Sequence, residues 1–194
     1  MIEDSVDLQI VELYNRDITA LYSINQISKK LKKAYPYINK RANRLISKGI
    51  LKKVTIGRSY LCSINLKSDS ARAYLMLNEI KNKNTLYKKN KLLSKIGYEI
   101  TKLIAEFKVY SVYYADDSII FLLDHIHDNE AIKRKCSILT QFNPIFFEIK
   151  DFEEEVLQNK KLIKDKIVLY GYEKFFEVLS TVEEQLKIKY VLMQ

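Results

Sequence analysis

Residues 18–67 read ITALYSINQISKKLKKAYPYINKRANRLISKGILKKVTIGRSYLCSINLK, and their pattern decides which fold is expected. The segment contains twelve Lys and Arg residues and no Asp or Glu. Positive charges gathered so closely repel one another, so a polyanion outside the chain is expected to neutralise them. The segment therefore points toward nucleic acid.

Apolar residues in this segment repeat with two different periods. From Ile24 to Leu31, and again from Ile38 to Ile46, they recur every three or four residues, which predicts two helices. Between residues 54 and 66 they alternate, which predicts two strands joined by a turn at Gly57-Arg58. Gly49 can end the second helix in the left-handed conformation. Helix, turn, helix and two-stranded ribbon is the order of a winged helix, whose second helix enters a DNA major groove.

The two halves of the 194-residue chain differ in charge. Residues 1–90 carry 18 Lys and Arg against 7 Asp and Glu, a net charge of +11. Residues 91–194 carry 15 against 17, a net charge of −2. This asymmetry indicates nucleic acid at one end and another role at the other. Residues 1–83 are expected to form a DNA-binding domain, 84–91 a basic junction, and 92–194 a second domain.

Composition and motifs exclude several classes of protein. No stretch approaches eighteen consecutive apolar residues, so no membrane helix is expected. The acidic start MIEDSVDLQ is not that of a secretory signal, so a cytoplasmic, nucleoid-associated protein is expected. Cys62 and Cys136 are expected to be buried free thiols. Neither a cofactor nor a metal site is expected, and the segment Asp124-His125-Ile126-His127-Asp128 is interpreted as a strand end followed by a helix cap.

The candidate DNA-binding residues lie on the two predicted helices and on the ribbon. Arg and Asn side chains bond to base edges in the major groove, whereas Lys and Tyr reach phosphates. The candidates are Lys29, Lys30, Tyr37, Asn39, Lys40, Arg41, Asn43, Arg44, Lys48, Lys52, Lys53 and Arg58.

Residues 44–75, RLISKGILKKVTIGRSYLCSINLKSDSARAYL, resemble the winged-helix module of archaeal transcription regulators. In that family the recognition helix ends in Leu-x-x-x-Gly-(Leu/Ile), here Leu45 to Ile50, and the wing closes on a Tyr and an Asn-Leu pair, here Tyr60 and Asn65-Leu66. The resemblance covers about residues 5–80 and implies binding of double-stranded DNA. The alternative is a winged helix that is used only for protein contacts.

The second domain is expected to contain both helices and strands. The expected elements are a helix over about 92–107, strands over 109–114 and 118–124 joined by a turn, a helix over 129–140, a strand over 144–149, helices over 151–157 and 162–169, and a final helix from residue 173.

Residues 143–179, NPIFFEIKDFEEEVLQNKKLIKDKIVLYGYEKFFEVL, are similar to the tail of minimal nucleotidyltransferase domains. Active members carry Gly-Ser after the first strand, two Asp separated by one residue on the second, and a third acid on a later strand. Those carboxylates hold the Mg²⁺ ions. In this chain Ile119 and Phe121 occupy the positions of the paired Asp, no Gly-Ser is present, and the later strand offers only Glu148. The resemblance therefore implies the fold without the chemistry, so no catalytic residue is assigned and the chain is not expected to be an enzyme.

These features favour an α+β protein with an N-terminal winged helix-turn-helix and a small α/β nucleotidyltransferase-like domain. We expect a sequence-preferring, double-stranded DNA-binding transcription regulator. The second domain, or the apolar stripe of the final helix (Leu179, Val182, Leu186, Tyr190 and Met193), would form a homodimer, although the stripe could equally pack on the protein's own core. The alternatives are an active nucleotidyltransferase whose winged helix presents a nucleic-acid substrate, and a chromatin-coating protein.

Overall fold

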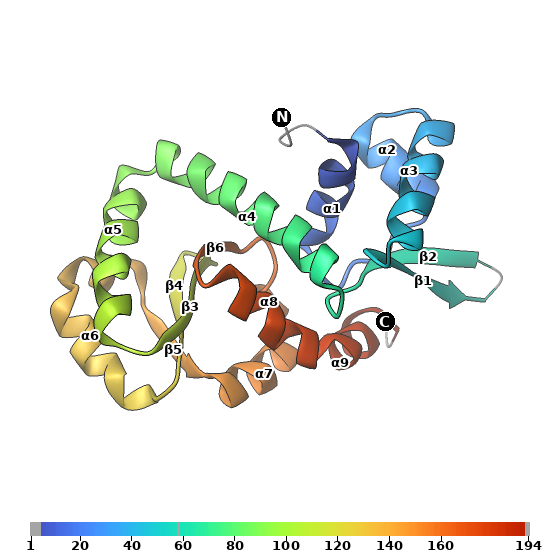
Figure 1. Ribbon diagram of the computed structural model, residues 1–194. Helices are drawn as coiled ribbons and strands as arrows, with labels where there is room; N and C mark the ends of the chain where they lie inside the picture. Colours follow the sequence, from blue (N-terminus) through green and yellow to red (C-terminus); the bar gives the residue numbers. More distant parts are fainter. Residues whose placement is uncertain (1–4, 58, 193–194) are drawn as a thin grey trace. The chain divides into compact units, whose positions relative to one another are not determined.

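A computed structural model describes residues 5–57 and 59–192 of the 194-residue chain, which divides into two compact units (Figure 1). Unit 1 contains the residues up to Asn78 and those from Glu183 onward, and unit 2 contains Glu79–Val182. The described residues form an α+β structure with one sheet of two strands and one sheet of four. None of the described helices is long and apolar enough to cross a membrane.

Unit 1 has the predicted elements in the predicted order. Three helices, α1 (Val6–Arg16), α2 (Ile24–Leu31) and α3 (Tyr35–Ser47), precede the antiparallel strands β1 (Leu51–Ile56) and β2 (Ser59–Ile64). Side-chain caps start α1 at Ser5 and α2 at Ser23, whereas α3 starts with Pro36 in its first turn and no side-chain cap.

Hydrogen bonds fix the start of α2 and the end of α3. The Ser23 hydroxyl accepts a hydrogen bond from the Gln26 amide, and the Gln26 side chain accepts one from the Ser23 amide, so α2 starts with a capping box. Gly49 has φ +67°, and its amide donates to the Ile46 carbonyl at 2.9 Å, which ends α3.

The core of unit 1 joins the helices to the ribbon. Ile10, Ile27 and Ile38 are fully buried, one from each helix. The Tyr14 hydroxyl is also buried and donates to the Cys62 carbonyl at 3.0 Å, and Tyr22 pairs with Cys62 as an isolated bridge. The ribbon is therefore held to α1 and to the segment before α2 by hydrogen bonds as well as by apolar contact.

Unit 2 is built on a four-stranded sheet in the order β5-β4-β3-β6 (Figure 1). The strands are β3 (Val109–Ala115), β4 (Ser118–Leu123), β5 (Ile145–Glu148) and β6 (Ile167–Tyr170). The β4–β5 pair is parallel, and β3 is antiparallel to both β4 and β6. Asp116 and Asp117, with φ values of +47° and +58°, form the predicted turn between β3 and β4.

Helices cover both faces of this sheet. One face packs against α5 (Lys91–Glu106) and α6 (Asn129–Lys135) through a core that includes Ile119 and Phe121. On the other face Tyr113 of β3 meets aromatic rings from α7 (Ile149–Gln158) and α8 (Tyr172–Thr181). Burial on both faces explains why these strands read as continuous apolar runs.

Three predicted helices of the second domain differ from the structure. The helix expected over 162–169 is wrong, because residues 167–170 form β6, an edge strand paired with β3. A run as short as Ile-Val-Leu-Tyr fits a buried strand and a helix face equally well, so periodicity does not separate them. The helix expected over 129–140 breaks at Cys136 and continues as a 3₁₀ helix over Ser137–Phe142. The final helix is interrupted at Val182, after which α9 spans Glu183–Lys187.

The expected domain boundaries also differ from the division into units. Helix α4 (Asp69–Lys89) continues through most of the segment predicted as a junction, and Asn90 then caps α5. The two units divide inside α4, between Asn78 and Glu79. Residues from Glu183 onward belong to unit 1, where the Lys187 ammonium donates to the Ile64 carbonyl at 2.9 Å.

The apolar stripe of the C-terminal segment is buried in its first part. Leu179, Val182 and Leu186 are buried, whereas Tyr190 is half-buried. Met193 lies outside the described residues. Three of the five positions therefore contribute to the protein's own core.

Candidate nucleic-acid interface

Helix α3 has one buried face and one basic face. Ile38, Ala42 and Leu45 are fully buried and fix the helix against unit 1. Because these residues follow the helical repeat, the side chains between them point away from the core. Among the predicted site residues on α3 and at its C-cap, the exposed ones are Tyr37, Lys40, Asn43, Arg44 and Lys48. The exposed face of α3 therefore presents cations, an amide and a phenol, with no acidic side chain among them.

The structure separates the twelve candidate residues into three groups. The exposed group contains Lys29, Lys30, Tyr37, Lys40, Asn43, Arg44, Lys48 and Lys53. The half-buried group contains Asn39, Arg41 and Lys52. Arg58, predicted at the tip of the ribbon, lies outside the described residues.

Arg41 is engaged by neighbours inside unit 1. Its Nη1 atom lies 3.7 Å from Oδ1 of Asp7 in α1, and the Asp7 side chain is only 9% exposed. The Arg41 guanidinium also lies 5.6 Å from the centre of the Tyr37 ring, and a hydrogen bond with Tyr37 followed by the charge of Asp7 raises the pKa of Arg41. Arg41 thus compensates a buried carboxylate, and its base contact stays a prediction.

Replacing Arg41 with Ala is therefore expected to act first on stability. The Asp7 carboxylate would remain buried without its cation, at an expected cost of about 1–3 kcal/mol in the free energy of unfolding. Urea titration of the full chain measures this loss. The double variant Asp7→Asn/Arg41→Ala removes the stranded charge and should regain most of it. A single variant as stable as the parent chain would contradict the role given to this pair.

Lys52 is likewise paired within unit 1. Its ammonium lies 3.4 Å from Oε1 of Glu183, which is 2% exposed and also pairs with Lys187. Burial lowers the pKa of Lys187. Lys53, the next residue along β1, is exposed and lies 4.7 Å from the centre of the Tyr60 ring. Of the two ribbon lysines, Lys53 is the one whose charge is available to a ligand.

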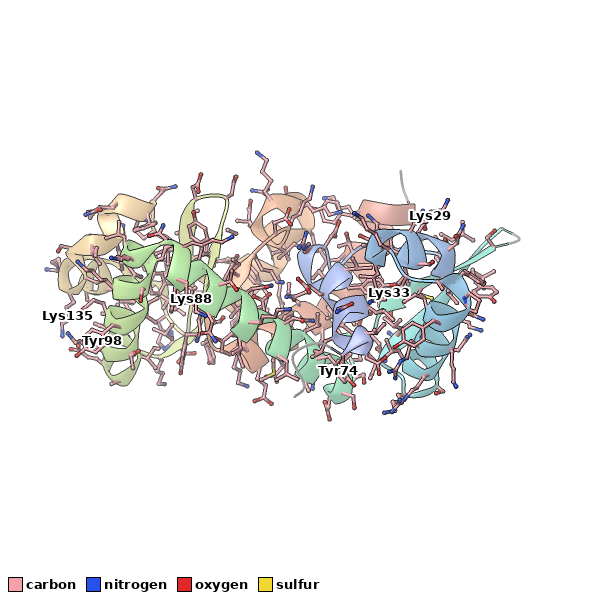
Figure 2. The ribbon with its side chains drawn as sticks, turned by 90° about the horizontal axis from the view of Figure 1, so that it is seen from above. Lys29, Lys33, Tyr74, Lys88, Tyr98 and Lys135 are labelled. Atoms are coloured by element: carbon pink, nitrogen blue, oxygen red, sulfur yellow. The ribbon has the colours of Figure 1, made fainter. Side chains whose placement is uncertain are left out.

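The second helix adds basic residues near its C-terminal end. Lys29 and Lys30 are exposed, and Lys30 lies 5.0 Å from the centre of the Tyr22 ring. Lys32 ends α2 with φ +52°, and the Ser28 hydroxyl donates to the Lys33 carbonyl at 2.6 Å. Figure 2 shows Lys29 and Lys33 on this part of unit 1. The turn between α2 and α3 is therefore held in a defined shape, with Lys32 exposed and Lys33 half-buried.

Two exposed tyrosines were not among the predicted site residues. Tyr35 is 48% exposed and Tyr60 is 53% exposed. Both line a cavity of about 310 Å³, together with Ser23, Ile24, Asn25 and Ser59. Their position inside the acid-free segment is the one sequence signal that could have identified them, because aromatic rings between cations are typical of nucleic-acid surfaces.

The positions that matter in the nucleotidyltransferase resemblance are occupied as follows. Ile119 and Phe121 are fully buried in the core beneath α5 and α6. Asp124 accepts hydrogen bonds from the Tyr110 hydroxyl at 2.9 Å and from the Lys108 ammonium at 3.2 Å, which hold its pKa below the usual range. Glu148 accepts a hydrogen bond from the Ile126 amide at 3.0 Å. Among the residues that the structure describes, no three His, Cys, Asp or Glu side chains gather in a way that could hold a metal ion.

Comparisons with known proteins identified no relative of this chain. No protein-family model matches the chain, and no significant similarity to a curated protein or to a solved structure was found. Proposals about its function therefore depend on the residues and geometry described above.

Proposed function

We propose that this protein binds double-stranded DNA as a transcription regulator, with unit 1 acting as a winged helix-turn-helix and α3 as its recognition helix. The observation that carries the proposal is the exposed face of α3, where Lys40, Asn43, Arg44 and Lys48 stand over a fully buried apolar face. An α-helix fits the major groove of B-form DNA, and Arg and Asn side chains read base edges there.

The surroundings of α3 support the same proposal. Lys29 and Lys30 on α2 and Lys53 on β1 are exposed cations on elements that flank α3, as phosphate contacts to a duplex require. Residues 18–67 contain no carboxylate that would repel the DNA backbone. A winged helix serving only protein contacts would not need a surface of one charge sign.

We assign unit 2 a nucleotidyltransferase-like fold that performs no nucleotidyl transfer. Mg²⁺ needs oxygen ligands, and at the two positions where the resemblance places paired Asp residues the chain has Ile119 and Phe121, both buried. Unit 2 would instead supply dimerisation or partner contacts. Winged helices commonly read two half-sites through a symmetric dimer.

A homodimer is the expected assembly. Light scattering of the intact chain should therefore give a mass of twice 22.9 kDa at micromolar protein concentration. Truncation at residue 181 is not a clean test, because it also removes Glu183 and Lys187 from unit 1. A mass of one chain at all concentrations up to the solubility limit would count against the dimer.

The double variant Lys40→Ala/Arg44→Ala tests the proposed binding face. Each lost base contact should weaken duplex binding by about 1–3 kcal/mol, because base-edge and phosphate contacts are removed while the buried face of α3 is intact. Fluorescence anisotropy with a labelled duplex measures the affinity. The matched control is Lys150→Ala/Lys164→Ala, which removes two exposed cations from unit 2. Equal affinity of the two double variants would overturn the assignment of α3.

A further inference from the structure

One exposed face of α5 carries lysines around a tyrosine. Lys91, Lys95, Tyr98 and Lys102 follow one another at spacings of four, three and four residues, so they lie along one side of the helix. All four are exposed, and Tyr98 is 65% exposed, which is unusual for so large an aromatic side chain. We call these four residues the α5 stripe. The opposite side of the helix is the core face, made of Leu93, Ile96, Ile100 and Leu103.

The α5 stripe lies in a region where positive charge is concentrated. Unit 2 as a whole carries 17 Lys and Arg against 16 Asp and Glu, which is close to balance. Residues 80–98 nevertheless contain six Lys and no acidic residue. Their positive charge is therefore concentrated on the end of α4 and the start of α5, where a polyanion would find it.

A cavity of about 540 Å³ lies beside the α5 stripe. Ser94, Lys95, Tyr98 and Glu99 line it from α5, and Lys135, Cys136, Ser137 and Ile138 line it from the end of α6 and the 3₁₀ helix that follows. Figure 2 shows Tyr98 and Lys135 at the same end of unit 2. The volume lies in the range of sites that bind small organic molecules. The lining combines an aromatic ring, cations and hydroxyl groups with one carboxylate, that of Glu99, whose charge is compensated by Lys102.

The cations at this site fall into two pairs with different surroundings. Lys102 is paired with Glu99 at 3.1 Å and lies 4.6 Å from the centre of the Tyr98 ring. Lys135 is paired with Glu106. Among the residues that the structure describes, the ion pairs at this site involve only Lys102 and Lys135, and none involves Lys91 or Lys95. Two lysines are thus available to phosphates next to an exposed ring and a cavity.

We propose that unit 2 binds single-stranded nucleic acid along the α5 stripe, with one unpaired base in the cavity, stacked on Tyr98. Lys91 and Lys95 contact the phosphates on either side of that base. Proteins that bind single strands combine a basic track with aromatic side chains on which bases stack. In a duplex the bases are already stacked on each other, so a duplex would leave Tyr98 and the cavity unused. This site is separate from the duplex-binding face proposed on α3.

Anisotropy titrations of the full chain with fluorescein-labelled dT20 test the proposal. Replacing Tyr98 with Ala should weaken dT20 binding by about 5- to 150-fold, which is the range measured for loss of one base–aromatic stack. Tyr98→Phe keeps the ring and should stay within about twofold of the parent chain. Lys91→Ala/Lys95→Ala should weaken binding and reduce its salt dependence by about 0.7 per lost phosphate contact. The Lys150→Ala/Lys164→Ala variant serves again as the charge control.

Three results would overturn the single-strand site. They are no measurable binding of dT20 by the parent chain, an unchanged dT20 affinity in Tyr98→Ala, or an equal loss of dT20 and duplex affinity in that variant. The duplex titration of Lys40→Ala/Arg44→Ala is a separate readout that tests the α3 face. Failure of one site is therefore distinguishable from failure of the other.

Discussion

Replacing Glu79 with Ala is expected to lower the free energy of unfolding by about 3–5 kcal/mol, because it removes the carboxylate that is paired with a buried lysine. The Glu79 Oε1 atom accepts a hydrogen bond from the Lys166 ammonium at 2.7 Å, and both side chains are fully buried. The Glu79 Oε2 atom accepts a second hydrogen bond from the Val168 amide at 2.8 Å. One carboxylate therefore fastens α4 to β6 within unit 2.

Two control variants make this prediction specific. Glu177→Ala breaks an ion pair with Lys174 in which both side chains are about half exposed, and such a pair contributes only about 0–1 kcal/mol. Glu79→Met/Lys166→Met replaces the buried pair with apolar side chains and should recover part of the loss. Urea unfolding followed by circular dichroism gives all three values. Equal losses in Glu79→Ala and Glu177→Ala would contradict the structural role of the buried pair.

Replacing Gly171 with Ala is expected to lower the free energy of unfolding by about 4 kcal/mol or more, which is an exceptionally large effect for a single substitution. Gly171 has φ +69°, a conformation that side chains with a Cβ rarely adopt. An added Cβ would also lie 2.0 Å from the Tyr110 carbonyl oxygen and 2.8 Å from Cα of Ser111. Both of these are backbone atoms, so β3 or the start of α8 would have to move.

Gly49 provides the matched control for this prediction. It has a similar φ of +67°, but an added Cβ would meet nothing within 4 Å. Gly49→Ala should therefore cost only the left-handed penalty of about 1–2 kcal/mol. Thermal unfolding of the two variants separates backbone conformation from the clash. A Gly171→Ala variant no less stable than Gly49→Ala would show that the close approach to β3 is absent.

The elements of residues 18–67 are predictable because their signals are local. Gly49 ends α3 through hydrogen bonds to residues within one turn, and the alternation from residue 54 to residue 66 marks the ribbon. The Asp116-Asp117 turn is equally local. Such features depend on neighbours that can be read directly from the sequence.

Strand β6 and the buried ion pair depend on residues far apart in the chain. Residues 167–170 become a strand because β3 offers an open edge more than fifty residues earlier, and Lys166 is buried because Glu79 lies beside it. No residue close to Lys166 or to Glu79 in the sequence signals that the two side chains pair with each other. A lysine in a basic stretch is therefore expected at the surface until its partner is known.

Contacts between residues far apart in the chain also limit what the sequence predicts about the candidate DNA-binding site. Helical spacing predicts which face of α3 carries Lys40 and Arg44, but not that Arg41 reaches Asp7 of α1 or that Lys52 reaches Glu183 near the other end of the chain. Because of these pairings, Arg41 and Lys52 are less available to DNA than the exposed candidate residues. The exposed residues Tyr35, Tyr60 and Tyr98 become visible only when burial is known.

The salt dependence of duplex binding tests the central claim most directly. Phosphate contacts release counterions, so the logarithm of the association constant should fall linearly with the logarithm of salt concentration, by about 0.9 per contact. We predict a steep slope for the parent chain, and a slope shallower by one to two contacts for Lys40→Ala/Arg44→Ala, with no change for Lys150→Ala/Lys164→Ala. An affinity that does not vary with salt, or an identical slope in all three proteins, would contradict duplex recognition through α3.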